Sequence, residues 1–450
     1  MKSFLLPFTL LVILSAVPPG LRAAETAPTP DQVEVTPEFI DSLIAEAQGQ
    51  NPALEAAGAR AQAANSAVAA VRKWDDPTAS FGVWAPGSGG FKNTQQGNLF
   101  YGLDEKLPLH GLPDLKRKVA AADASREQLA ASYETQKLRR DLRVAVYGVA
   151  LAGREAELAE QDLTWLDATV AAVDHRYRVG QASQVDWLKS ETARAMASDA
   201  LTTKERESEH SAFALNRLLN RDLHAAWPRV AVPDLGPPIY YTPQLVAAAL
   251  TAEPQLQIMR QESNSAEAAA NLTHRERLPD VSAGIQAWQY SGDGGFRQGT
   301  ATVSFSVPWL NRSSYDDEWR RDEERKRASD FAAEDQALSV REELNHHIVD
   351  LDAARRRAVL FRDQLIPLTQ QTLVSAQAAW EHNLGTFQDI LDAHRMLVED
   401  QLALAQALTD QNTLFADISF LTGSRDTGTL AALAGEPTSD HDGHIPDESK

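Results

Sequence analysis

Apolar and polar residues alternate along the stretch that ends at Trp309. The apolar positions are Ala301, Val303, Phe305, Val307 and Trp309, and the polar positions are Thr300, Thr302, Ser304 and Ser306. Successive side chains of a β-strand point to opposite faces of a sheet, so this spacing predicts a strand with one apolar face and one hydroxyl-rich face. Pro308 has no backbone N–H to donate and is expected to end the sheet pairing.

A very long helix is predicted after this strand. Asn311 and Ser313 or Ser314 offer caps for its start, and residues 315–383 are expected to continue as a helix without a breaking residue. A turn at residues 384–386 and a returning helix over 387–421 complete a helical hairpin. Before the strand, the sequence predicts a helix over 244–277 and a partner strand over 281–290.

The same order of elements occurs earlier in the chain. A helix over residues 38–73 restarts at Pro52, which suits a first helical turn, and Pro254 corresponds to it in the later copy. A strand hairpin follows, in which Pro108 corresponds to Pro308. A helix over 115–179 then extends about 100 Å at 1.5 Å per residue, and 184–219 return as a helix. The residues on one face of the second strand are Leu99, Tyr101, Leu103 and Leu107, with Phe100 and Glu105 disturbing the alternation.

This duplication divides the chain into two similar halves. A charged start, an apolar run too short to span a membrane and small residues at Ala23 and Ala24 indicate a secretory signal. The predicted units are a signal peptide (1–24), a leader (25–37), a first repeat (38–223) with β-hairpin 78–109 and a tip near 180, a proline-rich linker without regular structure (224–243), a second repeat (244–423) with β-hairpin 281–309 and a tip near 385, and a disordered acidic tail (424–450).

The composition excludes several classes of function. The chain carries 43 Lys and Arg against 63 Asp and Glu, a net charge of −20, which argues against nucleic acid as a partner. It has no cysteine and therefore no disulfide, no thiolate metal site and no lipid anchor on an amino-terminal Cys. No segment after the signal is apolar for long enough to be a transmembrane helix, so any spanning of a membrane would fall to the strands.

Two hairpins are too few to close a barrel, so several chains are expected to contribute strands to one barrel with lipid outside and water inside. Trp74, Trp84, Trp288 and Trp309 lie in or beside the predicted strands, where an interfacial aromatic belt would place them. Ordinary packing of a soluble β-sheet explains these tryptophans equally well.

The duplicated order of helix, strand hairpin, long helix, tip and helix resembles the TolC family of outer-membrane efflux factors over residues 36–423. The local marks are the segments LPLHG (107–111), VPWLN (307–311), RVG (178–180) and QDILDA (388–393). The resemblance implies a mainly α fold with transmembrane β structure, in which a homotrimer forms a twelve-stranded β-barrel, four strands per chain, continued by a periplasmic α-helical barrel.

The resemblance also implies a place and partners. It implies the outer membrane of a Gram-negative bacterium, contact with its lipid, and docking to a periplasmic adaptor (membrane fusion) protein and an inner-membrane RND-type pump. The short, cysteine-free chain with His110 and Gly111 after its first hairpin is more similar to the heavy-metal efflux branch than to the other branches.

The resemblance further implies a periplasmic gate. Asp389 and Asp392 match an acidic ring at the narrowest point, where six carboxylates from three chains would raise one another's pKa and attract cations. Alternatively, the two Asp residues only favour the dipole at a helix start. Asp186 matches a latch to the neighbouring tip, and His382 stands where its partner is commonly an aromatic hydroxyl. An Asp–His pair would strengthen on acidification, whereas a solvated histidine would have no such role.

The tips themselves are expected to dock the adaptor. Gly180 and Gly385 are expected to give both turns unusual backbone angles. The residues that the resemblance assigns to docking are Arg178, Val179, Gly180, Leu384, Gly385 and Thr386.

No enzyme, cofactor or metal site is expected. His346 and His347 point to different sides of a helix, and His441 and His444 lie in the tail. The glycine-rich segments 86–90 and 291–295 lack the Lys and helix of a phosphate loop, and no HExxH or GxSxG motif occurs. The expected function is a passive exit duct of a tripartite efflux system, with heavy-metal cations as a candidate cargo. The alternatives are an exported soluble coiled-coil scaffold and, less favoured, a periplasmic helical enzyme or solute receptor.

Overall fold

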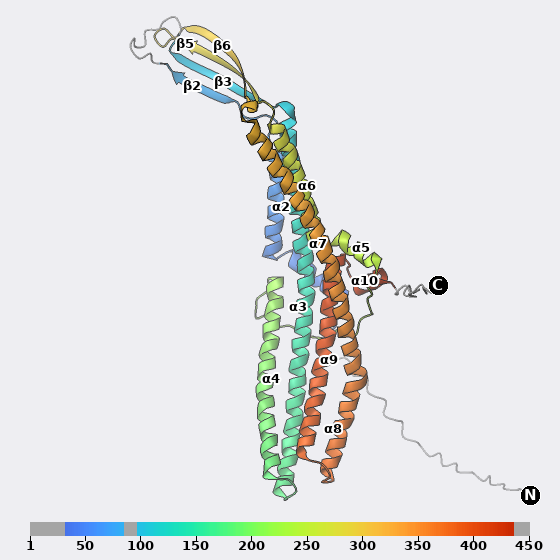
Figure 1. Ribbon diagram of the computed structural model, residues 1–450. Helices are drawn as coiled ribbons and strands as arrows, with labels where there is room; N and C mark the ends of the chain where they lie inside the picture. Colours follow the sequence, from blue (N-terminus) through green and yellow to red (C-terminus); the bar gives the residue numbers. More distant parts are fainter. Residues whose placement is uncertain (1–31, 85–96, 436–450) are drawn as a thin grey trace, which may run out of the picture.

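The computed structural model describes residues 32–84 and 97–435, and it is a long rod with a β-sheet at one end (Figure 1). The predicted signal peptide, the first hairpin loop over 85–96 and the tail beyond residue 435 lie outside the described residues. The sheet consists of β2 (Thr78–Val83), β3 (Leu99–Leu107), β5 (Val281–Gln289) and β6 (Phe296–Phe305), in that order. All neighbouring strands are antiparallel, so the two predicted hairpins lie side by side.

One face of the sheet is apolar and exposed. The strand register aligns Ala79 with Leu103, Ile285 and Ala301, and it aligns Phe81 with Tyr101 in the next row. The exposed fractions of the larger side chains on this face are 75% for Phe81, 66% for Ile285 and 73% for Val303. The opposite face carries Ser80, Gly102, Gln286 and Thr300 in one row. The predicted two-faced strand is thus confirmed and extends to all four strands.

Trp288 lies on the polar face, so of the two explanations for this tryptophan, packing within the sheet fits its position better than a lipid-facing aromatic belt. Its register partner is Phe100, and the two ring centroids are 5.1 Å apart. Gly82 is the next partner in the row, and a Cβ there would come within 2.3 Å of the Phe100 ring. Phe100 disturbed the apolar alternation because it belongs to this second face. Trp74, Trp84 and Trp309 are 49%, 43% and 58% exposed.

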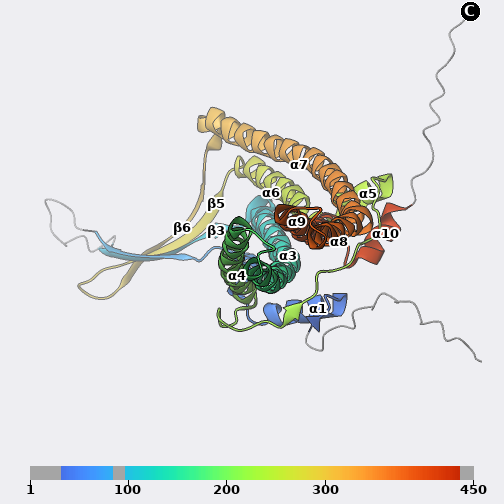
Figure 2. The ribbon, with the colours of Figure 1, turned by 90° about the horizontal axis from the view of Figure 1, so that it is seen from below.

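Two equivalent sets of helices follow the two hairpins. The first half contains α1 (Pro37–Gln48), α2 (Pro52–Ala70), α3 (Leu112–Arg178) and α4 (Gln184–Leu219). The second half contains α5 (Pro243–Ala252), α6 (Pro254–Glu276), α7 (Arg312–Leu360), α8 (Ile366–Glu381) and α9 (Phe387–Thr422). Proline occupies the first turn of α1, α2, α5 and α6, where its missing N–H costs no intrahelical hydrogen bond. Figure 2 shows α3 beside α9, with α4 next to α3 and α8 next to α9.

The predicted uninterrupted helix over 315–383 is wrong. A π-helical segment, Phe361–Leu365, separates α7 from α8, and Pro367 lies in the first turn of α8. Proline cannot donate to the carbonyl four residues earlier and its ring clashes with it, so the helix widens at that point. The Thr369 hydroxyl donates to the carbonyls of Leu365 and Ile366 at 3.0 and 3.1 Å.

The start of α7 also differs from the prediction. Asn311 occupies the N-cap position, but no side chain forms a capping hydrogen bond there. A 3-10 turn, Pro308–Asn311, leads the chain into the helix instead, and Leu109–Gly111 does the same before α3.

Short elements occur in two segments that were predicted to be irregular. Arg229–Val230 forms β4, which pairs in parallel with β1 (Gln32–Val33). Thr427–Ala434 forms α10, in the segment assigned to a disordered tail. Leu430 and Ala434 of α10 are buried against Leu245 and Phe415, so an apolar anchor holds this segment in place (Figure 1).

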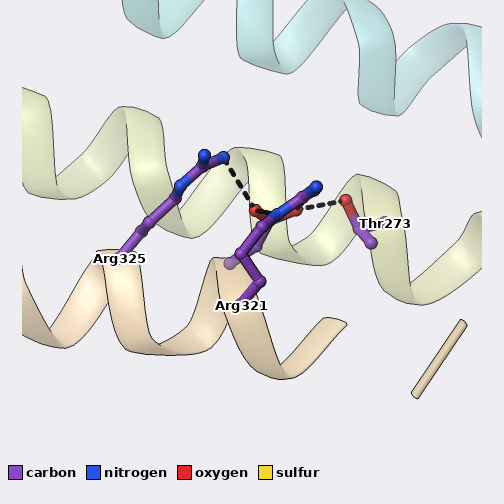
Figure 3. A network of polar contacts seen from close by, with 4 residues as sticks. Thr273, Arg321 and Arg325 are labelled. Atoms are coloured by element: carbon purple, nitrogen blue, oxygen red, sulfur yellow. Dashed lines mark hydrogen bonds and ion pairs between the residues drawn. The ribbon is translucent and has the colours of Figure 1, made fainter. Parts of the chain in front are cut away.

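A buried carboxylate ties α6 to α7 near the sheet (Figure 3). Asp322 is 5% exposed and accepts a hydrogen bond from Thr273 Oγ1 at 2.7 Å. Arg321 donates to both carboxylate oxygens at 2.8 and 2.9 Å, and Arg325 adds a contact at 3.2 Å. The Arg321 guanidinium is the largest cause that lowers the pKa of Asp322 to about 2, so the carboxylate is charged and fully bonded.

Candidate functional site at the helical tips

The two helical hairpins end side by side at the end of the rod opposite the sheet (Figure 1). The helix α3 ends at Arg178, and Gly180 follows with a φ of +78°. Gln181 N–H then donates to the Arg176 carbonyl at 2.8 Å. At the other tip Asn383 has a φ of +56°, and Leu384 N–H donates to the Ala379 carbonyl at 2.8 Å. Both helices therefore end in a Schellman motif, with glycine at one tip and asparagine at the other.

The returning helices begin in the same way at both tips. Ser183 and Asp186 form a capping box at the start of α4, and Thr386 and Asp389 form one at the start of α9. In the second box Thr386 N–H donates to Asp389 Oδ2 at 2.8 Å, and Asp389 N–H donates to Thr386 Oγ1 at 3.2 Å. Asp186 and Asp389, which were predicted to act as a latch and as part of a gate, thus occupy equivalent positions.

Hydrogen bonds from Thr386, first from its hydroxyl and then from its backbone, lower the pKa of Asp389. The sequence predicted a raised pKa for Asp389, an effect that requires carboxylates from other chains. Within one chain the pKa of Asp389 is lowered instead. Asp389 is therefore a charged cap at the start of α9, which is the alternative role that the sequence offered for it. This role does not remove the carboxylate from the tip surface, where Asp389 is exposed.

Asp392 and His382 have different surroundings from Asp389. Asp392 Oδ1 accepts a hydrogen bond from Gln388 Nε2 at 2.9 Å, and Lys189 Nζ of α4 donates to Gln388 Oε1 at 3.0 Å. His382 is an exposed residue at the end of α8. No hydrogen bond or ion pair joins Asp186 to His382 within the described part of the chain.

The prediction for Gly385 is wrong. Its φ lies outside the left-handed region, which Asn383 occupies at this tip. A Cβ at Gly385 would instead lie 3.0 Å from Ala379 Cβ, so close packing is what favours glycine. For Gly180 the expected unusual angle is confirmed, and the space around its Cα is open.

Arg176 joins the two tips, and the sequence reasoning missed it. Its guanidinium carbon lies 4.0 Å from the ring centroid of Trp380, and Nη2 donates to Asn383 Oδ1 at 3.1 Å. The apolar residues beneath are Val173, Leu373, Phe387, Ile390 and Ala393. Asn383 therefore serves twice, as the left-handed residue of the turn and as the acceptor for Arg176. Tryptophan in α8 and arginine in α3 gave no local pattern that could reveal this pairing.

A second missed contact lies farther along α9. His394 is 8% exposed, its ring stacks on Trp165 at a centroid distance of 3.6 Å, and Nε2 lies 2.7 Å from Asp162 Oδ1. Since Trp165 and Asp162 belong to α3, this contact also holds α3 and α9 together.

The residues assigned to docking are largely solvent-exposed. Leu384 is 84% exposed and Val179 is 56% exposed, which are high values for aliphatic side chains. Arg178 forms an ion pair with Asp174 at 2.8 Å and remains exposed. The tips therefore present an apolar residue from each turn beside charged groups.

The described residues include no cluster of three or more side chains suited to a metal ion. His346 lies 3.4 Å from Asp350 and His347 lies 3.6 Å from Glu343, so each has a carboxylate partner along its own helix. His441 and His444 lie outside the described residues. None of the described helices is long and apolar enough to cross a membrane.

Comparison with known proteins finds a family model that matches the first half of the chain. Residues 43–221, from α1 to just past α4, match the family model of the outer membrane efflux protein. The match covers most of the first repeat. No curated protein matches the chain in sequence.

Solved structures of outer-membrane proteins and channels share the fold over most of the chain. CusC is 15% identical with a TM-score of 0.74, covering 86% of this chain and 92% of its own. VceC of Vibrio cholerae is 16% identical with a TM-score of 0.72, covering 86% and 96%. CmeC of Campylobacter jejuni is 12% identical with a TM-score of 0.73, covering 94% and 98%. At such identities the likeness concerns the fold, and it includes the second repeat, which the family model does not match.

The capping box makes a prediction that separates Asp389 from Asp392. Thr386→Ala should destabilise the first turn of α9 by about 1 kcal/mol and speed amide hydrogen exchange there by about fivefold. Asp392→Ala, which removes no cap, should leave that exchange unchanged. Hydrogen–deuterium exchange with mass spectrometry measures both.

The same measurement tests the pKa of Asp389. Because its folded pKa is lowered, its stabilising effect is present above the ordinary pKa of about 3.9 and is lost as the pH falls through the lower folded value. Protection of the first turn, corrected for intrinsic exchange, should therefore persist below pH 4 and then decline. An equal response of the Asp392→Ala and Thr386→Ala proteins would contradict the assignment of the cap.

Proposed function

We propose that three copies of this chain form a passive exit duct through an outer membrane, as one component of a tripartite efflux system. The observation that carries the proposal is the four-stranded sheet, whose apolar face is exposed on every strand. Among the described strands, β2 and β6 each lack a neighbour on one side. In water, an exposed apolar face and open strand edges are both unfavourable for a monomer, because each favours association with other molecules.

The strand lengths support a place in lipid. β3 and β5 have 9 residues each, and β6 has 10 residues. A tilted strand needs about 9 to 11 residues to cross a bilayer. Pairing β6 of one chain with β2 of the next in a ring of three would give twelve strands, an even number within the range of outer-membrane barrels. The apolar face would contact lipid, and the polar face would line the lumen.

The helices support a long aqueous passage beyond the barrel. α3 has 67 residues and extends about 100 Å at 1.5 Å per residue. Its length and its largely half-buried surface suit a wall helix that packs against neighbours on several sides. In this proposal the duct uses no cofactor and catalyses no reaction, since an inner-membrane pump of the RND type supplies the energy. A soluble coiled-coil scaffold is the alternative, and it gives the exposed apolar sheet no role.

The tips are proposed to act as gate and docking surface. Asp389 and Asp392 of three chains would form the acidic ring, and Asp186 and His382 would meet between neighbouring chains. Docking of a periplasmic adaptor is assigned to the exposed turns, through Arg178, Val179 and Gly180 at one tip and Leu384, Gly385 and Thr386 at the other. The support is their exposure and their position at the end of the rod (Figure 1).

Heavy-metal cations are proposed as the cargo of the duct. The sequence basis is His110 and Gly111 after the first hairpin. The structure adds that His110 has a φ of +61° and lies in an exposed turn before α3. An acidic gate would favour cations of any kind.

The native mass of the protein tests the duct. Extracted from the outer-membrane fraction in mild detergent, the protein should have the mass of three chains and should precipitate when the detergent is removed. Analytical ultracentrifugation with correction for bound detergent gives this mass. A monomer that stays dissolved without detergent would overturn the duct and favour the scaffold.

Neutral variants that preserve the capping box test the gate. Glutamine can replace an acidic residue at the third position of the box, so Asp389→Gln with Asp392→Asn removes charge while the cap is kept. Single-channel recordings should show lower cation selectivity and weaker block by multivalent cations. Asp389→Glu keeps the charge and should behave as the wild type. Equal selectivity in all three proteins would remove both residues from the ring.

Docking is tested at the exposed leucine. Leu384→Asp should abolish efflux in cells while the purified channel keeps its trimeric mass and conductance. Met196→Asp, at a residue of α4 that is 66% exposed and lies away from the tips, is the matched control. Tolerance to a panel of metal cations and organic dyes measures efflux and indicates the cargo class. Normal tolerance of the Leu384→Asp cells would show that this tip does not dock a partner.

A further inference from the structure

Midway along the rod, a cavity of about 340 Å³ lies between α3, the junction of α5 and α6, and the end of α9. Its charged lining residues are Arg139, Arg140 and Arg143 from one face of α3, and Arg425 just after α9. No Asp or Glu lines it. Four guanidinium groups around one cavity are unexpected in a chain whose net charge is −20. We call this cavity the arginine pocket.

The four arginines differ in what neutralises them. Arg140 is paired, since its Nε lies 2.7 Å from Asp417 Oδ1 and Nη1 lies 3.3 Å from Asp141. Arg139 has one long contact, 3.8 Å to Asp41. Arg143 and Arg425 have no carboxylate within ion-pair distance in the described part of the chain.

Arg143 is the least compensated of the four. It donates a hydrogen bond to the backbone carbonyl of Arg425, which carries no net charge. Burial is the largest cause that lowers the pKa of Arg143, and the nearby charge of Arg139 also lowers it, against the opposing effects of Tyr147 and of the Asp41 and Asp426 carboxylates. Arginine nevertheless stays protonated in proteins. The pocket thus holds a partly desolvated cation without a charged partner, an arrangement that an anion would stabilise.

The acidic groups nearby line an adjacent hollow and not the arginine pocket itself. Asp426 lines this hollow, which Arg143 and Arg425 share, and its Oδ1 accepts hydrogen bonds from the N–H and hydroxyl of Thr429 at the start of α10. Asp234 lines the same hollow. The side bounded by α3 and the end of α9 therefore remains basic. It also offers Ser419, Gln136 and Gln257 as neutral hydrogen-bonding groups.

We propose that the arginine pocket binds a multivalent oxyanion, through the guanidinium groups of Arg143 and Arg425 with Arg139 in support. Phosphate and carboxylate groups share the required chemistry, because both accept paired hydrogen bonds from a planar guanidinium. The volume of the pocket falls in the range of small-ligand sites. All lining residues come from one chain, so the proposal does not rest on the trimer or on efflux.

Such an anion could come from two sources. One is a free ion in solution. The other is the chain itself, since residues 436–450 follow α10 and carry Glu436, Asp440, Asp442, Asp447 and Glu448. The two sources are separated by testing the full chain and a chain that ends at Gly435.

The test is calorimetric titration of the purified full-length protein with inorganic phosphate and with citrate, at constant ionic strength set with sodium chloride. We expect saturable binding that Arg143→Gln with Arg425→Gln weakens by about tenfold or more, because both substitutions remove charge-assisted hydrogen bonds to the anion. Arg206→Gln with Arg341→Gln is the matched control, since both arginines are exposed and have no ion pair among the described residues. The control should bind as the wild type does.

Two further variants keep the test decisive. Arg425→Gln alone changes an exposed side chain, so it should fold even if the double variant does not, and it should still weaken binding. Arg143→Lys keeps the charge but loses the planar fork, so its affinity should be intermediate. Binding that appears only in the chain ending at Gly435 would support the pocket with the chain's own carboxylates as its occupant. No saturable binding in either chain, or equal loss in the control, would overturn the proposal.

Discussion

The structure depends on the sheet at one end of the rod, which has an apolar face that no other part of the described chain covers. Phe81, Ile285 and Val303 remain more exposed than a folded monomer in water would tolerate on adjacent strands. The opposite face, with Ser80, Gln286 and Thr300 in register, is equally unsuited to lipid. A sheet with these two faces suits a boundary between lipid and water, and its open edges favour pairing with further strands. In the proposed duct, further copies of the chain supply those strands.

In the helical part, the contacts must keep very long helices straight, antiparallel and in register. Buried apolar clusters do this at mid-length, where α1 packs on α3 and α4, and α5 and α10 pack on α7 and α9. Polar contacts do it elsewhere. Asp322 joins α6 to α7 near the sheet, His394 joins α9 to α3, and Arg176 joins the two tips. Each polar contact is specific in geometry, so the helices cannot slide past one another without breaking it.

Features with a local cause were predictable from sequence, and features that depend on distant partners were not. The strand periodicity, the prolines that restart helices and the positions of both tips are encoded within a few residues, and α4 follows its predicted bounds of 184–219. The face that Trp288 occupies was left open because only its register with Phe100 reveals it. The helix α10 was missed because a short helix in an acidic segment is stabilised by burial of Leu430 against α5 and α9. Pro367 was a local signal for the π-helical segment before it, and it was overlooked within a long helical pattern.

The two tips show how a repeat can keep its geometry while its residues change. Gly180 and Asn383 occupy the same left-handed position, and Asp186 and Asp389 cap the same helix start. The exchange of glycine for asparagine is not neutral, because the Asn383 side chain accepts a hydrogen bond from Arg176 and so joins its own hairpin to the other. Glycine at 180 can form no such contact. The contact between Arg176, Trp380 and Asn383 therefore links the first tip to the second, as the hydrogen bond from Lys189 to Gln388 also does, and a movement of one tip against the other must break both.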